Sequence, residues 1–174
     1  TNGVTSVSIT NATGGSIANN KIPNIRNTGT ISWNKVSSDS NNDKKLSGSE
    51  WKLTKTKNFG WNATTGKAEY ADIASDQQKP IAITDCVPAE NKAAAETTCS
   101  APAGAAEGQP YDVDPAAGQF KLKGLDWGRY TLVETKAPDG YDVDSTVRTF
   151  TFGPVAGSDG TGKWNSNSVA AATG

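Results

Sequence analysis

The chain has 174 residues, 34% of them apolar, which suits an all-β secreted module with one real core better than a helical enzyme. A net charge of −1 and the absence of a basic cluster interleaved with aromatics argue against nucleic-acid binding. The chain has no histidine and only two cysteines, so we expect no metal site, no cofactor and no enzyme.

No signal peptide, transmembrane run or sorting signal is recognisable, and we expect a piece of a longer protein with no membrane contact in this segment. Residues 1–27 read as a linker or as the remnant of an upstream domain. Residues 4–10 alternate as in a strand, and Pro23 restricts the segment around it to an edge or terminal strand.

The main domain is expected over residues 28–174, beginning with a strand at 30–36. In this strand Lys35 shares a face with Ile31 and Trp33. A lysine on an otherwise apolar face is unexpected in a half-buried strand. It is either a snorkelling or edge side chain, or a group with a special role.

A second strand is expected at 46–53, with Trp51 and Leu53 facing the core. An insertion of about 58–118 follows. It begins with turn-forming residues, contains a strand-like segment at 80–84 and is long enough for a short helical turn at 90–96.

Cys86 and Cys99 are the only cysteines, and both lie in this insertion. An even count in a secreted chain predicts a disulfide between them, and the alternative is two free surface thiols.

Strict alternation resumes at 119–125, and a further strand begins at Tyr130. Glu134 follows Tyr130 and Leu132 onto the face expected to be buried. An unpaired buried carboxylate is costly, so this residue needs a partner or a proton. A Pro/Gly turn ends the segment, and another alternating strand is expected at 146–152.

Residues 132–141 match every fixed position of L-x-E-T-x-A-P-x-G-Y, the E-box that this segment resembles in CnaB (collagen-adhesin B-type) domains of Gram-positive pilins and adhesins. Residues 46–53 resemble the family's L-x-G-x-x-F-x-L strand, with Trp51 where phenylalanine is usual. Residues 118–135 resemble its G-x-F-x-x-x-x-L-x-x-G-x-Y-x-L-x-E-T segment. The matches together span residues 30–57 and 118–152.

The resemblance implies an inverse immunoglobulin-like β-sandwich with a long disulfide-bracketed insertion. It also implies that Glu134 promotes an amide bond between Lys35 and an asparagine of the closing strand. Asn165 and Asn167 lie in the right sequence order, but residues 155–174 have a poor strand pattern, so the closing strand is weak or missing. Asn24 lies in an Ile-x-Asn-like context before Lys35, which resembles the closing strand of an upstream domain; the alternative is a plain polar linker.

The chemistry of such a bond depends on burial. Desolvation disfavours the charged forms of lysine and glutamic acid, so a neutral amine can attack while a protonated acid polarises the asparagine carbonyl. Without an asparagine in reach, the two side chains would form an ordinary buried ion pair.

The sequence therefore predicts a mechanically resistant stalk module of a cell-wall-anchored, extracellular pilin or fimbria, in contact with neighbouring domains or subunits. The rival interpretation is an adhesin domain that binds a host glycan or matrix protein through the 58–118 insertion.

Overall fold

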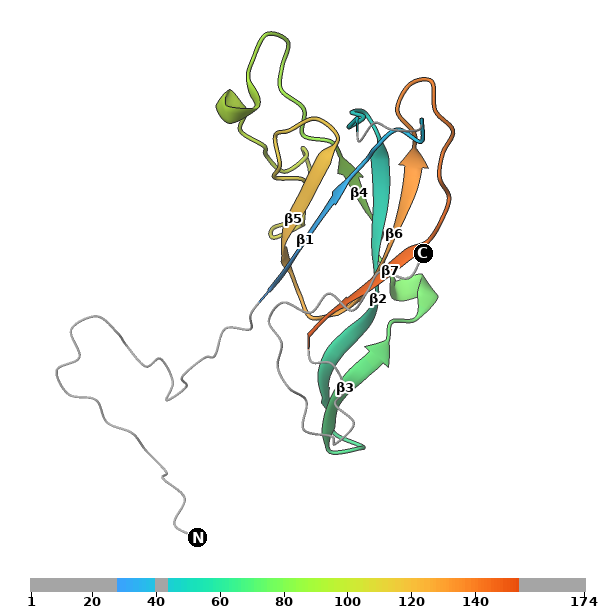
Figure 1. Ribbon diagram of the computed structural model, residues 1–174. Coiled ribbons are helices and arrows are strands. Elements are labelled where there is room, and N and C mark those ends of the chain that lie inside the picture. Colours follow the sequence, from blue (N-terminus) through green and yellow to red (C-terminus); the bar gives the residue numbers. More distant parts are fainter. Residues whose placement is uncertain (1–27, 40–43, 154–174) are drawn as a thin grey trace, which may run out of the picture.

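The computed structural model describes residues 28–39 and 44–153 of the 174-residue chain (Figure 1). Its elements are seven strands and two short 3-10 turns. In order they are β1 (Gly29–Asn34), β2 (Glu50–Asn62), β3 (Lys67–Asp72), η2 (Ser75–Gln77), β4 (Ile81–Thr84), η3 (Ala94–Glu96), β5 (Gln119–Leu125), β6 (Gly128–Lys136) and β7 (Arg148–Phe152).

The strands form two sheets that face each other as a sandwich (Figure 1), as the sequence predicts. In the smaller sheet β1 pairs antiparallel with β5. In the larger sheet the order is β3-β2-β6-β7, and β4 also pairs with β2. Along one edge β2 pairs with β6, and along the other with β4 first and then with β3.

The core lies between the sheets and is made by the inward positions of each strand. It is formed by Trp51, Leu53, Ile83, Phe120, Leu122, Leu125, Tyr130, Leu132, Phe150 and Phe152. In β5 and β6 alternation predicted the inward positions of Phe120, Leu122, Tyr130 and Leu132, because successive strand side chains point to opposite sides. The alternation in β5 breaks after Leu122, so that Leu125 and not Gly124 is buried.

The first part of the insertion differs from the sequence-based expectation. Trp61 and Asn62, expected in its turn-rich start, instead belong to β2, whereas residues 63–66 do form a turn. This turn joins β2 to β3, and the two strands pair as a hairpin. The rings of Phe59 and Tyr70, paired across the two strands, lie 4.8 Å apart and stabilise this extension. The helical turn expected at 90–96 is limited to the 3-10 turn Ala94–Glu96.

Residues 1–27, expected as a linker or upstream remnant, and residues 154–174, which include the expected closing strand, lie outside the described ranges. Within 28–39 and 44–153, no helix is long and apolar enough to cross a membrane.

Candidate functional site around Lys35 and Glu134

Glu134 occupies an inward position of β6 and is only 2% exposed. Tyr130 and Leu132 precede it on the same face, as the sequence predicts. On the neighbouring strand its register partner is Trp51, which is also buried. A carboxyl group is therefore placed among core aromatic rings, where its charge is costly unless it is paired.

Lys35 directly follows β1, and its backbone is held on both sides. Its N–H donates to the carbonyl of Gly118 (2.9 Å), and its own carbonyl accepts the N–H of Leu46 (2.9 Å). The side chain lies on the inward face behind Ile31 and Trp33 and retains 14% exposure. The predicted shared face of these three residues is confirmed.

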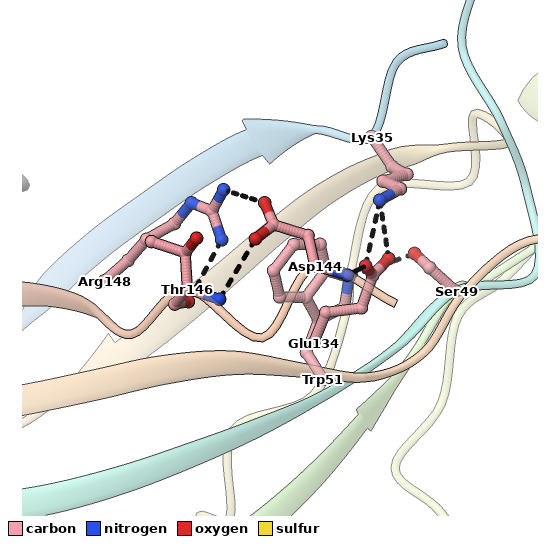
Figure 2. A network of polar contacts seen from close by, with 7 residues as sticks. All are labelled: Lys35, Ser49, Trp51, Glu134, Asp144, Thr146 and Arg148. Carbon is pink, nitrogen blue, oxygen red and sulfur yellow. Dashed lines mark hydrogen bonds and ion pairs between the residues drawn. The ribbon is translucent and has the colours of Figure 1, made fainter. Parts of the chain in front are cut away.

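Lys35 and Glu134 are 99 residues apart in sequence but in direct contact (Figure 2). Nζ lies 2.8 Å from Oε1 and donates a hydrogen bond to Oε2 at 2.9 Å. The Glu134 side chain is fully buried in this contact. The structure thus brings together the two residues that the sequence singled out as a chemical pair.

The second donor to Glu134 is a backbone group. The N–H of Asp144, in the β6–β7 connection, donates to Oε2 at 2.8 Å. Oε1 accepts no hydrogen bond from any described residue, although Nζ lies close to it. The two carboxyl oxygens therefore have different environments, and sequence reasoning missed this because a backbone donor has no side-chain signature.

Two aromatic residues lie next to the pair: Trp33 shares a strand face with Lys35, and Trp51 is the register partner of Glu134. The rings of Trp33 and Trp51 meet edge to face with centroids 5.6 Å apart. The Trp51 indole N–H donates to the hydroxyl of Ser49, which is completely buried (Figure 2). Because the Glu134 side chain is fully buried, the local dielectric is low and the electrostatic interaction between Lys35 and Glu134 is stronger than in water.

The three asparagines predicted as partners of Lys35 are Asn24, Asn165 and Asn167, and all lie outside the described residues. Their roles and the roles of Lys35 and Glu134 in an amide bond therefore stay predictions.

The predicted disulfide between Cys86 and Cys99 is present. It lies beside Asp112, whose carboxylate accepts the backbone N–H groups of Cys86 (2.9 Å), Asp114 (3.0 Å) and Lys121 (2.8 Å). Burial raises the pKa of Asp112 above its usual value. This carboxylate ties the insertion to β5. No sequence pattern predicts this role, because the partners of Asp112 are backbone groups, two of them distant in sequence.

A second acidic anchor of the insertion is Asp85. Its Oδ2 accepts the N–H groups of Gly48 (3.2 Å) and Gly118 (2.9 Å). Gly118 is also the residue whose carbonyl holds the backbone of Lys35, so the insertion is tied directly to the candidate site.

A hollow of about 260 Å³ lies next to the disulfide, between β4 and the segment that carries Cys99. Tyr111 and Asp112 contribute to its wall. Among the described residues, no group of three or more histidine, cysteine or acidic side chains is arranged to hold a metal ion.

Comparison of the chain with curated proteins and with solved structures gave no match. The sequence profile of one family, SpaA prealbumin-like fold domain, matches residues 29–161. This match is consistent with the CnaB-type, pilin-like domain predicted from the E-box, and it covers both Lys35 and Glu134. The chain belongs to the SpaA prealbumin-like fold domain family.

Proposed function

We propose that this domain is a mechanically resistant stalk module of a Gram-positive cell-surface pilin or fimbria, stabilised by an amide bond that Lys35 forms with an asparagine. One observation carries the proposal: Lys35 at the end of β1 contacts the fully buried carboxyl group of Glu134 on β6. A buried lysine–carboxyl contact is costly to retain for stability alone, since an apolar pair of similar volume is often as stable.

The reaction begins with transfer of one proton from Nζ of Lys35 to Glu134, which needs no movement because the atoms are already in contact. The neutral amine attacks the side-chain carbonyl carbon of asparagine, while the protonated Glu134 donates a hydrogen bond to the carbonyl oxygen. The bond between this carbon and the asparagine amide nitrogen then breaks. Ammonia leaves with a proton from Nζ, a Lys–Asn amide remains, and Glu134 is available to shuttle protons.

This chemistry runs once in each molecule, so the domain is not an enzyme and needs no cofactor. Its rate comes from holding the reactants in contact, which gives a high effective concentration.

Asn165 and Asn167 follow β7 and are the candidate partners within one chain. Asn24 precedes β1 by a connection so short that it favours an antiparallel hairpin, whereas the family's first and last strands run parallel. Asn24 is therefore proposed only as a donor to a neighbouring subunit.

The mechanical role follows from where the bond would lie. A link between the end of β1 and a residue after β7 would join the two ends of the domain. Tension along a surface fibre would then pass through covalent bonds instead of separating the β1–β5 hydrogen bonds. The partners are neighbouring domains or pilin subunits, and the location is extracellular and anchored to the cell wall.

Intact mass under denaturing conditions tests the proposal. After allowance for the disulfide hydrogens, the wild-type chain should be lighter than calculated by one ammonia, and Lys35→Ala and Glu134→Gln should not be. Lys57→Ala is the matched control, because Lys57 forms an ion pair with Asp72 on the exposed hairpin (2.9 Å). Fragmentation of the cross-linked peptide identifies the asparagine. Wild type at its full calculated mass would refute an amide-derived bond within the chain.

A second candidate function is ligand binding by the insertion, favoured by the hollow of about 260 Å³ beside the disulfide. A host glycan or a matrix protein would be the ligand. Its test is binding to immobilised glycans and matrix proteins by wild type and by Tyr111→Ala, which alters the wall of the hollow. Equal binding by both proteins, or none, argues against this function.

A further inference from the structure

The connection between β6 and β7, residues 137–147, contacts Glu134 at one point and a residue close to Lys35 at another. The hydroxyl of Tyr141 lies 3.0 Å from that of Ser37, two residues beyond Lys35. The N–H of Asp144 donates to Glu134 Oε2 at 2.8 Å. The connection therefore spans from the lysine side of the pair to the carboxyl side.

Asp144 itself is held by its side chain (Figure 2). Its Oδ2 pairs with Arg148 Nη2 at 2.5 Å, and its Oδ1 accepts the N–H of Thr146 at 3.0 Å. Arg148 also donates from Nη1 to the carbonyl of Thr146 (3.2 Å), and its guanidinium lies 5.8 Å from the Trp51 ring. These contacts fix the backbone of an irregular segment at the residue that touches Glu134.

We infer that Asp144 is a positioning residue for amide-bond formation, held by Arg148, and that it makes Oε1 the oxygen of Glu134 that carries the proton. This inference rests on the proposed function. The carboxyl group can take the proton from Lys35 on either oxygen. A proton on Oε2 would weaken that oxygen as an acceptor for the Asp144 N–H, whereas a proton on Oε1 disturbs no hydrogen bond from a described residue.

The consequence is a carboxyl group with one fixed orientation. Oε2 stays bound to the connection, and Oε1 stays available to receive the proton and present it to the asparagine carbonyl. Without the Asp144 contact the carboxyl group can rotate, and its O–H points at the carbonyl for a smaller fraction of the time. Small errors in the placement of reacting groups can slow a reaction by as much as about 100-fold.

The Asp144–Arg148 pair is partly exposed, with side-chain exposures of 41% and 35%. Exposed ion pairs contribute little to global stability, so breaking this one should leave the fold intact. Its loss should therefore affect the rate of cross-linking far more than the melting temperature, and this separates positioning from a general structural role.

The experiment is a time course of cell-free synthesis of the full chain, stopped in acidic denaturant and read by intact mass. We expect Asp144→Ala and Arg148→Gln to lose ammonia roughly tenfold more slowly than wild type while reaching the same final mass. Arg148→Lys should keep most of the rate, because it retains a charge opposite Asp144. Asp72→Asn, which breaks the exposed Lys57–Asp72 pair, is the matched control and should react at the wild-type rate.

Wild-type rates for both Asp144→Ala and Arg148→Gln would overturn the inference, and so would an equal slowing by Asp72→Asn. If wild type loses no ammonia, the proposed function fails, and hydrogen exchange of the Asp144 amide tests the positioning contact separately. We expect exchange at Asp144 to be at least about tenfold faster in Arg148→Gln, with unchanged exchange at Leu53 in the core. Equal exchange at Asp144 in both proteins would show that Arg148 does not hold this contact.

Discussion

Trp33 of β1 and Phe120 of β5 are register partners whose rings stack with centroids 4.8 Å apart and an angle of 3° between their planes. Phe120 is only 1% exposed and also meets the ring of Trp51 edge to face. This aromatic group joins the two sheets directly beside the Lys35–Glu134 pair.

Phe120→Ala should lower the free energy of unfolding by about 3–5 kcal/mol, because it leaves a cavity between the sheets. Urea denaturation measures this loss. Trp61→Ala is the control: that ring is 71% exposed, so its removal should cost little. Similar losses for the two variants would contradict the placement of the core.

Gly118 and Gly124 both have positive φ, +70° and +73°, but only Gly118 is sterically enclosed. A Cβ at Gly118 would lie 2.7 Å from the backbone N and O of Leu46, whereas nothing lies within 4 Å of one at Gly124. Gly124→Ala should therefore cost about 1–2 kcal/mol from backbone strain alone. Gly118→Ala should cost clearly more, because Leu46 must also move. Thermal unfolding of the two variants measures the difference, and equal losses would contradict it.

Asp85 should make stability depend on pH in a defined direction. Burial raises its pKa above the usual 3.8, against the opposing effect of the Gly118 and Gly48 N–H groups, and the carboxylates of Asp112 and Asp114 raise it further. The folded state then holds the proton more tightly than the unfolded state. The contribution of Asp85 is fully present below pH 3.8 and is lost as the pH rises through the folded pKa.

The measurement is the unfolding free energy of wild type minus that of Asp85→Asn, at about pH 4 and about pH 7. Asparagine keeps an oxygen for the two N–H groups but does not titrate. This free-energy difference should be smaller at the higher pH, because wild type loses stability there and the variant does not. If this free-energy difference is the same at both pH values, or is larger at the higher pH, the charge of Asp85 does not destabilise the folded protein.

The disulfide should protect the insertion from local unfolding and proteolysis more than it protects the core. Thiol labelling of the denatured, unreduced chain should give no signal, since Cys86 and Cys99 are joined. Replacing both with serine should lower the unfolding free energy by up to about 3 kcal/mol. Limited proteolysis should then cut first between residues 87 and 98. Unchanged proteolysis in the double variant would mean that Asp85 and Asp112 suffice to hold the insertion.

Removing one member of the Lys35–Glu134 pair should lower the free energy of unfolding more than replacing both with apolar residues. Lys35→Ala leaves the Glu134 carboxyl group buried without its partner, and such a loss costs about 3–5 kcal/mol before any cross-link is counted. The apolar double variant, Lys35→Met with Glu134→Leu, should regain part of this stability. Chemical denaturation of the three proteins tests the order, and a double variant less stable than Lys35→Ala would contradict it.

Much of the site could be predicted because it depends on strand alternation. The inward position of Glu134 follows from Tyr130 and Leu132, and that of Lys35 from Ile31 and Trp33. Alternation is local, so a single sequence reveals it.

What could not be predicted depends on contacts between distant backbone groups. Asp144 contacts Glu134 through its backbone N–H, which every residue except proline has. The residue type at position 144 therefore does not predict this contact. The buried role of Asp85 depends on where Gly48 and Gly118 meet in the fold. The extension of β2 to Asn62 was hidden because Gly60 and Asn62 are residues that favour turns.

The pairing of β2 with two short strands has a consequence for crowded assemblies. Without β3 and β4, one long edge of β2 would present unpaired N–H and C=O groups and could recruit strands from adjacent molecules. In the structure β3 and β4 cover this edge of β2. The new edge strands have only 6 and 4 residues, and such short edge strands are poor templates for aggregation. If the domain is part of a fibre, as proposed above, the insertion would limit edge-to-edge strand pairing between neighbouring copies.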